Sequence, residues 1–315
     1  MGEQQYEPQT AAYNDAQFEE LIALGKSVKS RDFLGVLFLL VGIIMSIVML
    51  GSQWFVIGIL IMIGALIFMA ITSATINKKY RRMYKATLVN RVAKDYFSQF
   101  TYQPEKGFTR DYLRGLGIMS FGSDYNSEDM LQGVYNNVPF TRADVYIADT
   151  TTDSEGNSST TVYFRGQWLE LQPNKRFQTD LQIIQKGFGF TNKRKGFFTK
   201  KEDRRHVIET EDVEFNKKFQ CLCQNDAEAF YLLTPTLMQA IMKLSQVLPY
   251  KMMIAFVDNT LHVLVDTHRD SMEPTLPKCG NLDRPIADLR ADMEIITGLI
   301  SGLLLDRSIF QGYMQ

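Results

Sequence analysis

Residues 33–76 read FLGVLFLLVGIIMSIVMLGSQWFVIGILIMIGALIFMAITSATI, and this stretch decides how the chain is organised. Between Asp32 and Lys78 there is no Asp, Glu, Lys, Arg or His, although 22% of the whole chain is charged. An uncharged apolar block of this length is typical of membrane-spanning helices. It divides into two runs, residues 33–50 and 54–76, which would extend about 27 Å and about 34 Å as helices.

The charges around this block predict its orientation. Only GSQ at 51–53 separates the two runs, so the helices are expected to be antiparallel neighbours whose outer ends lie on the same side of the membrane. Basic residues flank both outer ends: Lys26, Lys29 and Arg31 come before the first run, and Lys78, Lys79, Arg81, Arg82 and Lys85 follow the second. By the positive-inside rule, both outer ends and both chain termini are expected in the cytoplasm.

The five basic residues after the second run are predicted to lie at the membrane surface. There they could contact anionic headgroups, or act only as determinants of topology, which is the simpler interpretation. A cleaved signal peptide is the competing interpretation of the first apolar run. The long polar stretch before residue 33 and the second run directly after the first both disfavour it.

Composition excludes some classes of function. The formal net charge of −1 lacks the strongly basic balance expected of a nucleic-acid-binding protein, so no nucleic acid partner is expected. The three cysteines, Cys221, Cys223 and Cys279, are too few and odd in number for a disulfide framework. We expect reduced thiols, which suits a cytoplasmic domain.

The rest of the chain is predicted to form three regions. Residues 1–32 form a cytoplasmic segment with a short amphipathic helix at about 15–29. Residues 77–100 form a cytoplasmic stem helix that continues the second membrane helix, because Tyr80, Tyr84, Leu88 and Val92 recur at intervals of four. Residues 101–315 form a soluble α+β domain.

Alternating apolar residues predict strands in this domain, at 130–135, 138–149, 160–171, 177–186 and 213–224. Asn136-Asn137 is suited to a tight turn, and residues 150–159 form a polar loop. Thr234 is expected to cap a helix that begins at Pro235. A hairpin around Asp258-Asn259 and a last helix at about 285–305 complete the domain. The fold class is thus α+β: a two-helix transmembrane hairpin, then a mostly antiparallel β domain with C-terminal helices.

Four short segments resemble a known family. They are FNKKF at 215–219, DAEAFYLLTP at 226–235, IAFVDN at 254–259 and YFRG at 163–166. Together they are similar to a bacterial family known only as a domain of unknown function, number 3137, and the resemblance covers most of the chain after Lys78. It implies a location in the bacterial cytoplasmic membrane and an association with LemA-type membrane proteins. It implies no activity and no catalytic residue.

The segment around the glycines of KGFGF at 186–190 is a candidate binding segment. Its residues are Lys186, Phe188, Phe190, Lys193, Arg194 and Lys195. The phosphate-loop patterns G-x-x-x-x-G-K-[ST] and G-x-G-x-x-G are both missing. Basic and aromatic side chains together could instead contact a membrane surface or RNA. A solvated loop is the simpler interpretation.

The sequence predicts no metal site, cofactor or catalytic residue. His206, His262 and His268 lack the spacing of metalloprotease ligands. Cys221 and Cys223 would share one face of a strand, but zinc sites need further ligands at suitable spacing. Asp149, Asp153, Glu155 and Asn157 lack the spacing of a calcium-binding EF-hand loop. Neither a G-x-S-x-G element nor a cofactor fingerprint is present.

These observations favour a membrane-anchored interaction or scaffold module. Its expected partners are the lipid bilayer and another membrane or cytoplasmic protein, for which the family resemblance suggests the LemA type. The alternative is an enzyme that acts on a lipid or envelope precursor at the cytoplasmic membrane surface. The sequence does not specify the oligomeric state.

Overall fold

The computed structural model describes residues 15–48, 55–172, 180–189, 205–274 and 282–303, and only part of the side chains in the first two helices. Backbone packing divides the chain into two compact units. The first comprises residues 1–92 and 273–290, and the second comprises residues 93–272 and 291–315. The predicted boundary at residue 100 therefore lies a few residues after the division between the units.

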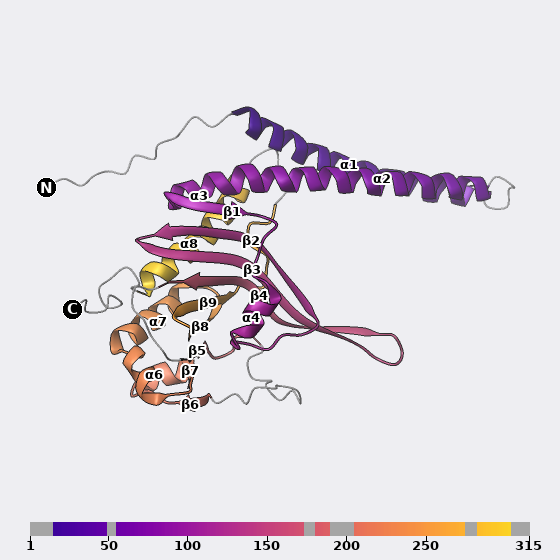
Figure 1. Cartoon of the computed structure of the whole chain (residues 1–315). Helices are drawn as coiled ribbons and strands as arrows, with labels where there is room; N and C mark the ends of the chain where they lie inside the picture. Colours follow the sequence, from indigo (N-terminus) through magenta and orange to yellow (C-terminus); the bar gives the residue numbers. More distant parts are fainter. Residues whose placement is uncertain (1–14, 49–54, 173–179, 190–204, 275–281, 304–315) are drawn as a thin grey trace. The chain divides into compact units, whose positions relative to one another are not determined.

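Two long helices dominate the first unit. Helices α1 (Asp15–Val48) and α2 (Phe55–Tyr84) run side by side as an antiparallel pair (Figure 1). The sequence predicted a short helix before residue 32 and a separate one after it, but α1 is continuous, because no proline interrupts residues 15–48. Among the residues and side chains that the structure describes, no helix is both long enough and apolar enough to cross a membrane.

The predicted stem helix is present, but it ends before residue 100. After α2 the chain makes a π-helical turn, η1 (Lys85–Val89), and continues as α3 (Asn90–Tyr96). The next residues form strand β1 (Gln99–Gln103), which pairs with β2. Phe97, predicted on a helix face, follows α3 and packs on the ring of Phe140, with 4.9 Å between the ring centroids. Strand pairing and this aromatic contact outweigh the helical pattern here.

The second unit contains a sheet of nine strands in the described residues. Its order is β1-β2-β3-β4-β9-β8-β5-β7-β6, and every neighbouring pair is antiparallel. Besides β1, the strands are β2 (Asp124–Tyr135), β3 (Val138–Thr152), β4 (Ser158–Leu171), β5 (Leu181–Gln185), β6 (His206–Ile208), β7 (Phe219–Cys223), β8 (Lys251–Val257) and β9 (Thr260–Asp266). The predicted α+β class with a mostly antiparallel sheet is confirmed.

Both predicted tight turns are confirmed. Asn136 and Asn137 have φ of 48° and 61°, and Asp258 and Asn259 have φ of 47° and 61°. Two successive positive φ angles match the twist of a two-residue hairpin, and Asn and Asp tolerate them. The predicted polar loop at 150–159 is shorter than expected, because β3 and β4 extend to Thr152 and from Ser158.

Helices α4 (Arg110–Gly115), α5 (Val213–Lys218), α6 (Asp226–Leu232), α7 (Pro235–Val247) and α8 (Asp283–Gly302) complete the described elements. Thr234 caps α7 with Pro235 in its first turn, as predicted. The predicted strand at 213–224 is wrong in its first half. The carboxylate of Asp212 accepts hydrogen bonds from the backbone N–H groups of Glu214 and Phe215 and so starts α5, and only the second half forms β7.

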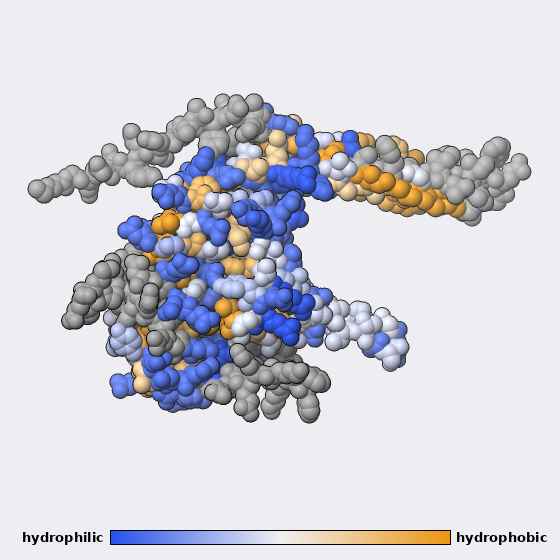
Figure 2. All heavy atoms as spheres, viewed as in Figure 1, coloured by the Kyte–Doolittle hydropathy of each residue, from blue (hydrophilic) through white to orange (hydrophobic). Residues whose placement is uncertain are grey.

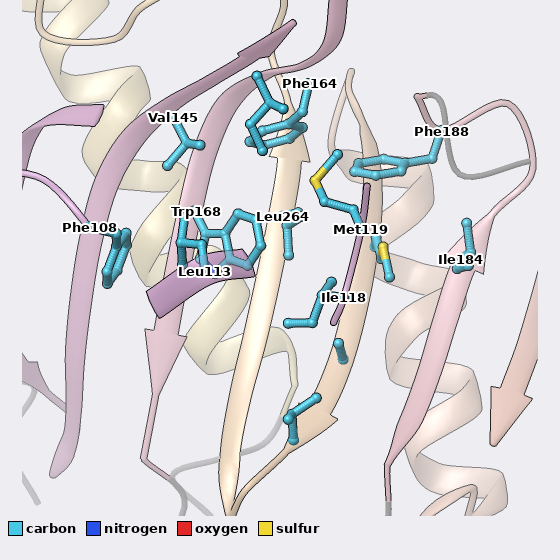
Figure 3. Packing of buried hydrophobic residues seen from close by; sticks show 14 of the residues in the cluster. Phe108, Leu113, Ile118, Met119, Val145, Phe164, Trp168, Ile184, Phe188 and Leu264 are labelled. Carbon is cyan, nitrogen blue, oxygen red and sulfur yellow. The ribbon is translucent and has the colours of Figure 1, made fainter. Parts of the chain in front are cut away.

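The two faces of the sheet are covered differently. The α4 face carries an apolar core cluster (Figure 3), which consists of Phe108, Leu113, Ile118, Met119, Ala143, Val145, Ile147, Phe164, Trp168, Ile184, Phe188, Met253, Ala255, Val257 and Leu264. On the opposite face, the side chain of Gln167 on β4 bonds Asp292 of α8. We refer to this second side as the α8 face.

Candidate functional site

The helix pair of the first unit exposes a band of large apolar side chains. Figure 2 shows this band along α1 and α2. Exposed fractions reach 70% for Phe33 and 62% for Ile71. The band comprises Phe33, Leu34, Val36, Leu37, Phe38, Leu39, Leu40, Val41, Ile43, Ile44, Ile63, Ile67 and Ile71. Soluble surfaces rarely carry so large a contiguous apolar patch, so this band is a candidate interaction surface.

The five basic residues predicted at the membrane surface have different environments. Lys78, Lys79, Arg81 and Arg82 are exposed. Lys79 Nζ lies 3.2 Å from Glu20 Oε1, which links the basic end of α2 to α1. The prediction is wrong for Lys85: its side chain is 4% exposed and its Nζ lies 3.0 Å from Glu273 Oε1. A buried, paired ammonium cannot contact lipid headgroups.

The candidate binding segment at 186–195 lies only partly within the described residues. Lys186 is exposed. The surface role predicted for Phe188 is wrong, because Phe188 is 2% exposed and its ring packs against Phe164 at 6.0 Å between centroids (Figure 3). Phe190, Lys193, Arg194 and Lys195 lie outside the described residues. Phe188, which lies between two glycines in the sequence, is therefore a core residue.

A buried polar network lies on the α8 face of the sheet. Arg142 and Asp144 are two apart on β3 and share this face. Arg142 Nη2 donates to Asp144 Oδ1 at 2.7 Å, and both side chains are less than 5% exposed. The other oxygen, Asp144 Oδ2, accepts from the backbone N–H of Ser271 at 3.0 Å. The pair therefore holds the segment after β9 against the sheet.

Asp292 of α8 joins the same network. Its carboxylate accepts from Arg269 Nη2 at 2.6 Å and from the backbone N–H of Met272 at 3.1 Å. Gln167 donates to the Ser271 hydroxyl at 2.9 Å and to Asp292 Oδ1 at 3.4 Å. These bonds connect β4, the segment 267–272 and α8, so the network fastens three parts of the second unit together.

Burial changes the acidity of this network. It raises the pKa of Asp144 well above the usual range, against the opposing effect of Arg142. It also raises the pKa of Asp292, although Arg269 and Arg142 oppose the shift. Sequence analysis missed these residues, because a strand with charges at alternate positions usually indicates a solvent-exposed face.

A second buried polar group lies among the apolar residues of the α4 face. His262 is fully buried, and its Nδ1 accepts a hydrogen bond from Trp168 Nε1 at 3.3 Å. This bond places the imidazole proton on Nε2, which has no hydrogen-bond partner among the described atoms. Burial lowers the pKa of His262 to about 4. Glu170, which accepts a hydrogen bond from Tyr112, lies 4.0 Å from His262.

Three potential metal ligands meet at the edge of the sheet beside α6. His206 on β6 is paired with Cys223 on β7, and Asp226 is the first residue of α6. One ligand atom from each lies within 4.8 Å of the other two. His206 Nε2 is 2.6 Å from Asp226 Oδ1, and Cys223 Sγ is 3.5 Å from the same oxygen. His206 and Cys223 lie on two different strands, and the residue spacing did not predict the register that places them opposite each other.

The predicted free thiols are confirmed within the described residues. Cys221 and Cys223 are both free and buried, and Cys279 lies outside that part of the chain. His268 is exposed and its Nδ1 lies 3.2 Å from Asp266 Oδ1. Of the three histidines, therefore, His262 lies in the core, His268 pairs with an acidic group, and His206 belongs to the three-ligand cluster.

Comparisons with known proteins give one structural likeness and one family. The chain is similar to the crystal structure of the mycobacterial trehalose monomycolate transport factor A, TtfA, with a TM-score of 0.37 and 10% sequence identity over 71% of this chain and 97% of that chain. No curated protein matches the sequence.

The family match covers most of β4, strands β5 to β9 and helices α5 to α8. Residues 162–305 match a family described as "Protein of unknown function (DUF3137)". All four segments that carry the resemblance, from YFRG at 163–166 to IAFVDN at 254–259, lie within the matched residues. Over residues 162–305, this chain is therefore similar to the DUF3137 family.

Proposed function

We propose that the chain is a membrane-tethered interaction module. In this proposal α1 and α2 insert into the bacterial cytoplasmic membrane as an antiparallel hairpin, and the second unit acts in the cytoplasm next to it. The observation that carries the proposal is the exposed apolar band on α1 and α2. Full burial of one large aliphatic or aromatic side chain is worth about 1.5–3 kcal/mol, so exposure of the whole band to water would be costly.

The sequence around the band supports the same proposal. The uncharged run extends from residue 33 to residue 77 and includes residues 49–54, which lie outside the described residues. Basic residues flank both of its ends. Lys78, Lys79, Arg81 and Arg82 are exposed and can act as determinants of topology, although Lys79 is also paired with Glu20 and Arg81 with Glu273, whereas Lys85 is buried. Both termini are therefore proposed to be cytoplasmic.

The second unit is proposed to bind a protein partner, and a LemA-type membrane protein is the partner that the family resemblance suggests. The alternative, an enzyme acting on a lipid or envelope precursor, would need catalytic groups that a substrate can reach. Arg142, Asp144 and His262 are buried, so these titratable groups do not support it.

Cysteine labelling in intact cells tests the membrane topology. A cysteine replacing Ser52 is expected to react with a membrane-impermeant thiol reagent. A cysteine replacing Ser154, in the exposed loop between β3 and β4, is expected to react only after the cells are opened. Labelling of Ser154→Cys in intact cells, or release of the full chain from membranes by alkaline carbonate, would overturn the proposal. Chemical crosslinking followed by affinity capture from native membranes tests for a LemA-type partner.

A further inference from the structure

We propose that His206, Cys223 and Asp226 form a zinc-binding site in the second unit, with a fourth coordination position open to solvent. The three residues offer an imidazole nitrogen, a thiolate sulfur and a carboxylate oxygen, which are the ligand types that zinc uses. They come from β6, β7 and the start of α6, so the folded chain, and not a local sequence motif, brings them together.

Strand pairing places two of the ligands. His206 and Cys223 are directly opposite each other in the antiparallel pair β6–β7, so their side chains project on the same side of the sheet. Cys223 is buried while the His206 side chain is 52% exposed, so the site opens from the interior of the unit toward solvent.

The start of α6 places the third ligand. The Asn225 side chain accepts hydrogen bonds from the backbone N–H groups of Ala227 and Glu228 and so caps the helix. Because Asn225 caps the helix, the carboxylate of Asp226 does not. It instead contacts His206 Nε2 and Cys223 Sγ. Its side chain is 57% exposed, which leaves room for a water molecule as a fourth ligand.

The distances require only small adjustments. Tetrahedral zinc, with bonds of about 2.0–2.3 Å, separates its ligand atoms by roughly 3.3–3.8 Å. Cys223 Sγ and Asp226 Oδ1 are already 3.5 Å apart. His206 Nε2 and Asp226 Oδ1 are 2.6 Å apart, so they would separate by roughly 1 Å to admit an ion. Both of these side chains are more than half exposed and can rotate.

The test uses the full-length protein in detergent micelles, freed of metal by a chelator. Zn²⁺ is titrated in competition with a chromophoric chelator, and Co²⁺ is used as a spectroscopic probe of sulfur ligation. We expect one equivalent of Zn²⁺ to bind, a thiolate-to-Co²⁺ charge-transfer band, and an increase in the melting temperature with Zn²⁺. His206→Gln should weaken Zn²⁺ binding more than about tenfold.

Matched controls separate this site from other thiols and imidazoles. Cys223→Ser should abolish the charge-transfer band, whereas Cys221→Ser, on the same strand, and His268→Gln, at an exposed position, should leave both affinity and band unchanged. If Cys223→Ser does not fold, the exposed His206→Gln still decides the question. Equal Zn²⁺ affinity in wild type and His206→Gln, or loss of the band in Cys221→Ser, would overturn the proposal.

Discussion

Both faces of the nine-stranded sheet are packed by apolar side chains, among them Leu169, Val263 and Val265 on the α8 face, but the α8 face also holds a charged network. The α4 face relies on apolar packing around Trp168 and admits one buried imidazole, that of His262. The α8 face contains, in addition to apolar side chains, Arg142, Asp144 and Asp292, each no more than 3% exposed and each bonded to a group on another element. Apolar packing is tolerant of small shifts, whereas charged hydrogen bonds demand one geometry.

This difference indicates what each face contributes. The apolar cluster supplies free energy of folding through the area that it removes from water. Buried ion pairs contribute little net stability, because desolvation offsets their attraction, but they fix the position of the segments that they join. On the α8 face those segments are β3, the residues after β9 and α8. The network is therefore expected to define how the part of α8 around Asp292 packs on the sheet.

The largest effect is expected when one charge of the network is removed. Arg142→Met leaves Asp144 buried beside an apolar side chain, and should lower the free energy of unfolding by about 3–5 kcal/mol. Urea unfolding of the full chain, followed by tryptophan fluorescence, measures this loss. The double variant Arg142→Met, Asp144→Leu removes both charges and should be more stable than the single variant. A cost below about 1 kcal/mol for Arg142→Met would show that the network is not essential.

The corresponding change on the α4 face is Phe188→Ala. The ring of Phe188 is fully enclosed, so its removal leaves a cavity beside Phe164 and should cost about 3 kcal/mol. Val207→Ala, at a side chain that is 52% exposed, is the control and should change stability by less than about 0.5 kcal/mol. If Phe188→Ala were as mild as the control, Phe188 would be a surface residue, as its sequence context predicted.

The buried imidazole makes the α4 face sensitive to pH. The pKa of His262 is about 4 in the folded protein, below its ordinary value of 6.5. Between these values the unfolded chain binds the proton and the folded chain does not, so stability falls as the pH is lowered through this window. From pH 6.5 to pH 5 the loss is roughly 1–2 kcal/mol, because each unit contributes up to 1.36 kcal/mol and the unfolded imidazole is already half protonated at pH 6.5.

A variant isolates this contribution from those of the buried carboxyls. Asp144 and Asp292 have raised pKa values, so they oppose the loss as the pH falls, but they do so equally in both proteins. His262→Phe should therefore show a flatter dependence of unfolding free energy on pH than wild type. Parallel curves for the two proteins would contradict the assignment of the pH dependence to His262.

Local patterns were sufficient to predict much of the fold. Asn136-Asn137 and Asp258-Asn259 predict turns, and Thr234 with Pro235 predicts a helix start. These residues favour the required backbone conformation whatever the rest of the fold. Residues 213–218 were mispredicted as strand, since their apolar spacing fits either structure, and the capping bond of Asp212 decides in favour of helix. Phe97 was placed in a helix because its packing partner, Phe140, is distant in sequence.

Sequence predicted less of the candidate sites. The apolar run and its flanking charges are local features, so they could be identified directly in the sequence. Burial of Lys85 depends on Glu273, and the cluster of His206 with Cys223 depends on the register of β6 and β7. Such sites form when separate elements come together in the folded chain, and residue spacing alone does not predict the register of that pairing.

The smallest effect is expected at an ion pair on the surface, which sharpens the contrast with the network. Lys217 Nζ lies 2.7 Å from Glu214 Oε1, the same separation as between Arg142 Nη2 and Asp144 Oδ1. The surface side chains are 66% and 72% exposed, whereas those of the buried pair are 0% and 4% exposed.

Water screens the surface charges, and both side chains lose rotational freedom when they pair. Removal of either charge leaves its partner fully hydrated. Glu214→Ala should therefore change the free energy of unfolding by less than about 0.5 kcal/mol, and added salt should reduce even this difference. Urea unfolding at low and high salt measures it beside Arg142→Met. If Glu214→Ala cost as much as Arg142→Met, distance rather than burial would set the strength of these pairs, and the contrast between the faces would lose its physical basis.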